Sequence, residues 1–342
     1  MEFNAFPGVV AFSVSENGVL AYGVGSGTPE IQMTWLDRQG KPLSTVGPEG
    51  NYQGIDVSPD GMRVVAHRPD GQGGDLWLFD LSRGTTSRLT FDSSQNNASP
   101  IWFPDGNRIV FKSFRGGKFG LYQKRANGAG GEELLIESET TIVPTSWSSD
   151  GRSLIYQITD PKTGNDLLAL PMPSRAALRR EPADGSKPVA LLRTPFSEMH
   201  GQISPDGAWL AYSSNETGRY EVYVQRFPSS VGKWQVSANG GSYPRWRGDG
   251  RELFYLDKGF DGKLVAVEVK TTPSTFEAGR IRELFDSGYY NALHGAFGPY
   301  HAYAVSADGQ RFLIPRPLST GSKATAPAPI AIVLNWDTGL RK

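Results

Sequence analysis

The sequence contains no cysteine and only four histidines among its 342 residues. The lack of cysteine excludes disulfide bonds, thiolate nucleophiles and metal sites with cysteine ligands. No apolar run reaches the about 18 residues that a membrane-spanning helix needs, so we expect no membrane insertion. The first residues, MEFNAFPGVVAF, also lack the basic start and the long apolar stretch of a signal peptide.

The two signs of charge are balanced, with 35 Lys and Arg residues against 35 Asp and Glu residues. Proteins that bind nucleic acids through phosphate contacts usually carry a basic excess, so we expect no nucleic-acid partner. Glycine (41) and proline (24) are abundant and together make up about a fifth of the chain, against about 12% in average proteins. Both residues favour turns, and no segment keeps the 3.6-residue period of a long helix. The composition therefore favours an all-β fold with many turns.

One motif recurs along the chain: an Asp-Gly or Asn-Gly pair that follows a small residue or proline and precedes a β-rich run. Examples are SPDGMRVVAH at 58–67 and SPDGAWLAYS at 204–213. The Asp-Gly pair supplies the positive-φ position of a tight hairpin turn. Seven glycines anchor these turns at intervals of 43 to 59 residues: Gly18, Gly61, Gly106, Gly151, Gly207, Gly250 and Gly309.

Each repeat reads as four short strands, with the anchor turn between the first and the second. The third strand of one unit is DLWLFDL (75–81), and a shorter fourth strand carries SRLTF (87–91). Four antiparallel strands every 40 to 50 residues are typical of a propeller blade. We therefore predict a single β-propeller domain over residues 1–342 with seven four-stranded blades, and six blades as the alternative.

The last unit offers no room for a fourth strand of its own. Its predicted third strand is IAIVLNW (330–336), and only six residues follow it. We therefore predict that residues 2–6 pair with this strand, complete the last blade and leave no open sheet edge.

The SPDG-type turns, with third strands such as DLWLFDL and fourth strands such as SRLTF, resemble the WD40-like PD40 repeats of TolB-type propellers. Longer segments are more specific and resemble the C-terminal propeller of acidobacterial-type serine/threonine kinases: FSVSENGVLAY (12–22), TWLDRQGK (34–41), GKWQVSANGGSYPRWRGDGRELFYL (232–256), YAVSADGQRFLI (303–314) and IAIVLNWDTGLRK (330–342). In those kinases the propeller follows a cytoplasmic kinase domain and a membrane helix. The resemblance implies a periplasmic or cell-surface sensing or protein-binding domain, part of a longer membrane-anchored kinase.

In a propeller, the loops that lead into the inner strands converge on one mouth of the central tunnel. The long loop 286–302, rich in aromatic residues, is among them, and we expect it to form a flap. Polar side chains that converge on one concave surface are the default hypothesis for a binding site. The predicted ligand-binding residues are Tyr52, Asp56, Asn97, Glu198, His200, Gln202, Tyr243, Arg245, His294 and His301.

Two functions are compatible with this mouth. The first is a non-catalytic recognition propeller that binds a protein, a peptide or a small ligand, with no catalytic residue and no cofactor. The alternative is a metal-dependent hydrolase of the lactonase or phosphotriesterase type, with Ca or Zn held by candidates Glu198, His200, His294 and His301. No G-x-S-x-G motif is present, so the sequence gives no sign of a serine hydrolase domain.

Overall fold

The computed structural model describes the chain in ten ranges: residues 12–15, 19–23, 31–70, 73–172, 187–229, 232–257, 262–272, 275–288, 301–318 and 330–334. Within them the fold is all-β, with a single 3₁₀ turn, η1 (Ser93–Gln95), as its helical element. The described ranges contain no helix with the length and apolarity of a membrane span.

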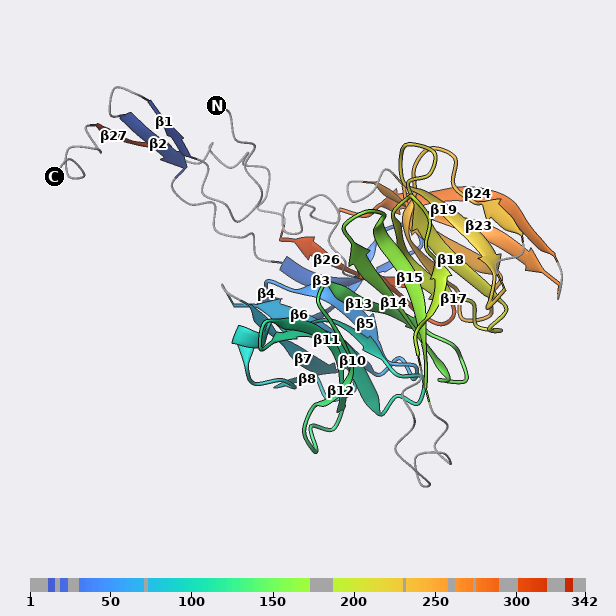
Figure 1. Ribbon diagram of the computed structural model, residues 1–342, viewed down its shortest axis with the longest axis horizontal. Coiled ribbons are helices and arrows are strands. Elements are labelled where there is room, and N and C mark those ends of the chain that lie inside the picture. Colours follow the sequence, from blue (N-terminus) through green and yellow to red (C-terminus); the bar gives the residue numbers. More distant parts are fainter. Residues whose placement is uncertain are drawn as a thin grey trace.

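Six four-stranded antiparallel sheets form the blades of a propeller, as Figure 1 shows. Blades 1 to 3 are each built from consecutive strands. Blade 1 comprises β5 (Gln53–Val57), β6 (Arg63–Pro69), β7 (Gly74–Asp80) and β8 (Thr85–Arg88). Blade 2 comprises β9 (Ala98–Trp102), β10 (Arg108–Arg115), β11 (Lys118–Arg125) and β12 (Glu133–Ser138). Blade 3 comprises β13 (Ile142–Trp147), β14 (Ser153–Asp160), β15 (Gly164–Pro171) and β16 (Val189–Leu192).

Blades 4 and 5 follow the same order, whereas blade 6 joins two distant parts of the chain. Blade 4 comprises β17 (Glu198–Ile203), β18 (Trp209–Ser214), β19 (Glu221–Arg226) and β20 (Lys233–Gln235). Blade 5 comprises β21 (Ser242–Trp246), β22 (Glu252–Leu256), β23 (Lys263–Thr271) and β24 (Phe276–Asp286). Blade 6 comprises β25 (Ala304–Val305), β26 (Arg311–Pro317), β3 (Ile31–Asp37) and β4 (Pro42–Gly50).

The six blades form a closed ring. Neighbouring inner strands contact one another in the order β5, β9, β13, β17, β21 and β25, and β25 contacts β5 again. Six buried apolar clusters lie in the ring, one at each interface between adjacent blades. The core is therefore divided among the blade interfaces, and the burial of apolar surface there holds the blades together.

The expectation of seven blades is wrong, and its six-blade alternative is confirmed. Strand β3 pairs with β26 residue by residue, from Ile31 opposite Pro317 to Asp37 opposite Arg311, and thereby closes the ring. Trp35 of β3 is 5% exposed, whereas Leu334 of the competing segment is 68% exposed. The burial of apolar side chains therefore favours β3 as the third strand of the closing blade.

The segment predicted to complete the last blade lies in a separate three-stranded sheet. This sheet has the order β1 (Phe12–Val14), β2 (Val19–Gly23) and β27 (Ile330–Leu334), and it stands apart from the six blades in Figure 1. Strand β27 pairs with β2 rather than with residues 2–6, which lie outside the described residues, as does the anchor Gly18. The prediction of one domain over residues 1–342 stays a prediction.

The predicted anchor turns are present at the other six glycines. Their φ angles lie between +66° and +73°, in the region that favours glycine. In the turn at Gly61, the Ser58 hydroxyl and the Met62 amide both donate to Asp60 Oδ1, while the Arg63 amide donates to Ser58 Oγ. The same bonds recur in the turns that begin at Ser148, Ser204 and Ser306. One end of the ring thus repeats one turn.

Substituting Gly207→Val tests the turn chemistry. A Cβ at Gly207 meets only Ser149 Oγ, at 3.8 Å, so the cost comes from the φ of +73° and not from a clash. We expect a loss of about 1–3 kcal/mol in the free energy of unfolding, measured by urea denaturation. Gly131→Val is the matched control, because Gly131 has open space and no positive φ. Equal stability of the two variants would contradict the turn assignment.

An engineered disulfide tests the closure of the ring in a chain without cysteine. Gln32 and Arg316 are direct partners in the pairing of β3 with β26. Direct antiparallel partners lie about 4.5–5.5 Å apart at Cα, which a disulfide can bridge. We expect Gln32→Cys with Arg316→Cys to form the bond under mild oxidation, seen as faster migration on a non-reducing gel. Bond formation by Arg316→Cys with Ile332→Cys instead would overturn the six-blade closure.

Candidate functional site

Six of the predicted site residues come together on the inner strands. We call Asp56, His200, Gln202, Tyr243, Arg245 and His301 the tunnel cluster. Asp56 lies on β5, His200 and Gln202 on β17, and Tyr243 and Arg245 on β21, while His301 precedes β25. The innermost strands of a propeller line its central tunnel, so these side chains come from four blades to one place.

Hydrogen bonds connect the tunnel cluster across the ring. Arg245 Nη1 donates to Gln202 Oε1 at 3.2 Å, and Gln202 Nε2 donates to the Thr145 carbonyl at 2.6 Å. His301 Nε2 lies 3.1 Å from the same carbonyl, which fixes that nitrogen as the protonated one. His301 belongs to blade 6 and Thr145 to blade 3, which face each other in the ring. The bond therefore spans the tunnel.

The backbone at the tunnel is bulged at equivalent positions. The pairing of the first strand with the second shifts register in blades 1 to 5. Four residues that precede the anchor glycine by seven positions have a positive φ: Gly54 (53°), Ser99 (52°), His200 (58°) and Tyr243 (59°). Bulges re-aim side chains and are common next to functional sites. Three of the four are not glycine, so the fold bears a local strain of about 1–3 kcal/mol at each.

Two strained residues pack against each other. The rings of His200 and Tyr243 lie 3.9 Å apart with an angle of 32° between their planes. Both side chains are buried, and the Tyr303 hydroxyl donates to the Tyr243 carbonyl at 2.9 Å. The bulges thus hold an imidazole and a phenol in fixed orientations beside Arg245.

Burial governs the electrostatics of the tunnel cluster. It lowers the pKa of His200 to about 3, with the Arg245 charge acting in the same direction. It also lowers the pKa of His301 well below its ordinary value, again with help from Arg245. Burial raises the pKa of Asp56 and lowers that of Arg245, while the attraction between the two opposes both shifts. Both imidazoles are therefore neutral at physiological pH.

Several cluster atoms are buried without a hydrogen-bond partner among the described residues. They include Arg245 Nη2, His200 Nε2 and His301 Nδ1, together with the hydroxyl of Ser242 on the same strand as Arg245. Buried polar atoms without a partner are uncommon in folded proteins. Their gathering at one place marks this cluster as the candidate site.

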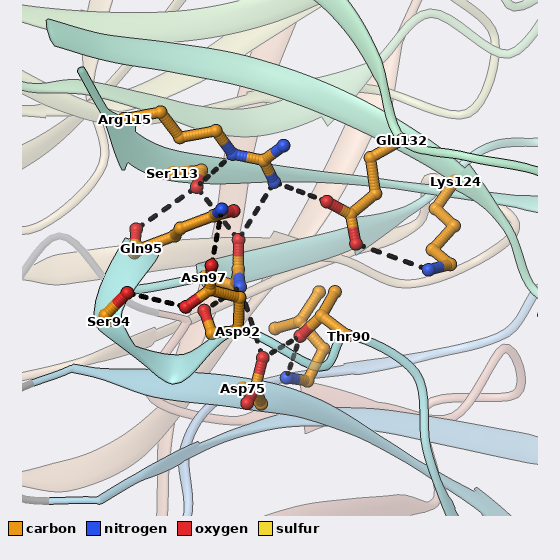
Figure 2. Close-up of polar contacts among 11 residues, drawn as sticks. Asp75, Thr90, Asp92, Ser94, Gln95, Asn97, Ser113, Arg115, Lys124 and Glu132 are labelled. Atoms are coloured by element: carbon orange, nitrogen blue, oxygen red, sulfur yellow. Dashed lines mark hydrogen bonds and ion pairs between the residues drawn. The ribbon is translucent and has the colours of Figure 1, made fainter.

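Asn97 lies at the mouth, but its amide group is fully used within the protein. Its Nδ2 donates to Asp75 Oδ1 at 3.1 Å and to the Asp92 carbonyl at 3.0 Å. Its Oδ1 accepts from Ser113 Oγ and Arg115 Nη2, as Figure 2 shows. These are the four hydrogen bonds that an Asn amide ordinarily makes. Asn97 therefore fastens the loop between blades 1 and 2 and has no polar atom left for a ligand.

Two other predicted residues lie away from the tunnel cluster. Tyr52 is 1% exposed and packs edge-on against Phe79 in the apolar cluster between blades 6 and 1. Glu198 is buried at the start of β17, where its Oε1 accepts from the Thr194 hydroxyl at 2.5 Å. Burial raises the pKa of Glu198 against the effect of this bond. His294 lies outside the described residues, as does most of the predicted flap 286–302.

Thr145 and Tyr303 belong to the site but were missed from the sequence. Both precede their anchor glycine by six positions, a spacing by which an alignment of the repeats could have found them. Thr145 contributes its carbonyl, which no side-chain motif reveals. Within the described part of the chain, no three His, Asp or Glu side chains gather closely enough to hold a metal ion.

The comparisons with known proteins agree with the fold. Residues 13–170 match the family model described as PD40, TolB beta propeller domain. The putative TolB from Agrobacterium tumefaciens has a TM-score of 0.62 at 16% identity, with 86% of this chain and 100% of that chain covered. TolB from Acinetobacter baumannii has a TM-score of 0.55 at 15% identity, with 80% of each chain covered. At these identities the likeness shows the fold alone.

A curated relative matches a shorter part of the chain. The uncharacterized peptidase YuxL of Bacillus subtilis (strain 168) is 24% identical over 190 residues, which is 47% of this chain. The match spans only 29% of the relative's own length. The peptidase activity in its name is therefore a property of a much longer protein.

The neutral state of His200 predicts a pH-dependent stability. The unfolded chain takes up a proton at His200 below about pH 6.5, whereas the folded chain does so only near about pH 3. Stability must therefore fall as the pH falls through this window. At about pH 5 the loss at this residue is about 2 kcal/mol.

The variant His200→Asn tests this dependence, because asparagine tolerates a positive φ and does not titrate. Urea denaturation at about pH 7.5 and about pH 5 should show that the wild type loses about 2 kcal/mol more stability than the variant. Equal losses in the two proteins would mean that His200 is protonated in the folded chain.

Proposed function

Because this chain carries TolB-type PD40 repeats in a β-propeller, we propose that it is a non-catalytic recognition module that binds a peptide or protein partner at the mouth of its tunnel. The observation that carries the proposal is the difference between the two ends of the ring. One end repeats the same Ser–Asp turn, whereas the tunnel cluster combines different polar groups from four blades. Only the second arrangement can recognise an asymmetric ligand.

The chemistry of the tunnel cluster suits recognition. Binding sites combine rigid aromatic groups with a few fixed polar groups that set orientation. Tyr243 and His200 provide stacked rings, while Gln202 and Arg245 are held by hydrogen bonds that leave part of the guanidinium free. The strained backbone fixes these groups before a ligand arrives, which lowers the entropy lost on binding.

The cellular setting is part of the proposal. The resemblance to kinase propellers and to TolB-type repeats supports a place outside the cytoplasm, in the periplasm or at the cell surface. A partner bound there would act on a longer, membrane-anchored kinase of which this propeller is the sensing part.

Peptide selection tests the proposed function and requires no identified partner. Phage-displayed peptides are selected on the purified chain, and their affinities are measured by fluorescence anisotropy. We expect Gln202→Ala and His301→Ala to weaken binding about tenfold, the size of a lost buried hydrogen bond to a fixed polar group. Arg251→Gln, on the exposed turn next to β21, is the control and should bind like the wild type. Unchanged affinity in all variants, or failure to select any peptide, would overturn the proposal.

The metal-dependent hydrolase stays the second prediction. The described residues offer no group of three ligands, and His294 lies outside them. Melting curves with calcium, with zinc and with a chelator separate the two functions. A rise in melting temperature with one metal, lost in Glu198→Gln, would favour the hydrolase over the recognition module.

A further inference from the structure

Arg245 carries a charge that no carboxylate of the described residues contacts. Its Nη1 is bonded to the neutral Gln202 side chain at 3.2 Å, and its Nη2 is buried with no hydrogen-bond partner in the described part of the chain. Asp56 acts on Arg245 only at longer range, because no ion pair within 4.0 Å joins them. The Nη2 amino group of Arg245 can therefore donate a hydrogen bond to an acceptor on a ligand.

Asp56 is held in place by bonds to Trp102. Its Oδ2 accepts from the Trp102 amide at 2.8 Å, and its backbone carbonyl accepts from the Trp102 indole at 3.3 Å. Trp102 belongs to blade 2. Arg245 belongs to blade 5, which faces blade 2 across the ring. The one acidic group of the cluster is thus bonded to blade 2, and it attracts the Arg245 guanidinium without forming an ion pair within 4.0 Å.

The two imidazoles add one acceptor and one adjustable group. His301 carries its proton on Nε2, so its free Nδ1 is an acceptor. His200 Nδ1 lies 3.3 Å from the Ser213 hydroxyl, and its Nε2 becomes a free donor when that hydroxyl donates. Arg245 Nη2 and His200 Nε2 can donate to a carboxylate, and His301 Nδ1 can accept from an N–H or O–H group. Together they match a ligand carboxylate that has an N–H or O–H group on a neighbouring atom.

We propose that Arg245 is the anchor for a ligand carboxylate in the tunnel, with His301 Nδ1 accepting a hydrogen bond from the group next to it. The inference rests on the proposed function and names the chemistry that the site selects. The C-terminus of a peptide and a sugar acid share this chemistry, because an amide N–H or a ring hydroxyl adjoins the carboxylate in each.

Nuclear magnetic resonance of the full chain, with nitrogen-15 in the arginine side chains, tests the proposal with small probes. N-acetylglycine represents a peptide C-terminus and glucuronate represents a sugar acid. We expect a saturable shift of one arginine Nε–H signal with either carboxylate and no saturable shift with N-acetylglycinamide. The same signal should be absent from Arg245→Gln and present in the control Arg251→Gln. The compound that binds more tightly, N-acetylglycine or glucuronate, shows whether the ligand carboxylate comes from a peptide C-terminus or from a sugar acid.

Two further variants separate an anchoring role from a structural one. Arg245→Lys keeps the charge without the fork and should weaken N-acetylglycine about tenfold. Asp56→Asn removes the competing negative charge and should tighten it about threefold, an effect that a purely structural pair would not produce. The comparison of N-acetylglycine with its amide in the wild type needs no variant, so it stays decisive if Arg245→Gln fails to fold.

The outcomes that overturn the inference differ from those that overturn the proposed function. Equal shifts with the acid and its amide, or tighter binding of inorganic phosphate than of either carboxylate, would remove the carboxylate anchor. If the carboxylate anchor fails in this way but the selected peptides still bind Gln202→Ala more weakly than the wild type, the proposed recognition function stands. Selected peptides that bind every variant equally would remove the recognition module itself.

Discussion

The antiparallel pairing of β26 with β3 is the constraint on which the rest of the ring depends. It brings together residues about 280 positions apart in the sequence and supplies two strands from each end to blade 6. Without it, the inner strand β25 would belong only to a two-stranded hairpin with β26. The closing blade also holds His301 of the tunnel cluster opposite Thr145. The blade that closes the ring thus also contributes one residue to the site.

The bulges of the inner strands allow blades with the same strand order to present different residues to the tunnel. Each blade has the same order of strands, but the positive-φ position near the mouth carries Gly54, Ser99, His200 and Tyr243 in different blades. Different residues occupy this position without altering the strand order, since the two strands pair again after the register shift at the bulge. The resulting strain is borne by six well-packed interfaces. Recognition chemistry can therefore vary while the blades stay alike.

The sequence predicts those features that local chemistry determines. Asp-Gly turns, strand alternation and repeat spacing depend on neighbouring residues, and six of the seven anchors form the expected turn. The number of blades depends on which of two similar apolar segments, 31–37 or 330–336, pairs with 311–317. Local patterns do not distinguish them, because both are short β-rich runs, and the difference appears only in burial.

The candidate site was predictable to a similar extent. Aligning the repeats on their anchor glycines brought Asp56, Gln202 and Arg245 into one column, and the structure places them on inner strands. The alignment could not show that Tyr52 turns into a blade interface or that Asn97 is saturated by Asp75, Ser113 and Arg115. Those outcomes depend on contacts with residues from other strands. A carbonyl such as that of Thr145 leaves no signature in any sequence.

The bond between His301 and Thr145 has a mechanical consequence. It ties two diametrically opposed blades, so the ring cannot widen along that diameter unless the bond breaks. The side chains of Gln202 from blade 4 and His301 from blade 6 both donate to the Thr145 carbonyl of blade 3, so groups from three blades meet at one point of the tunnel.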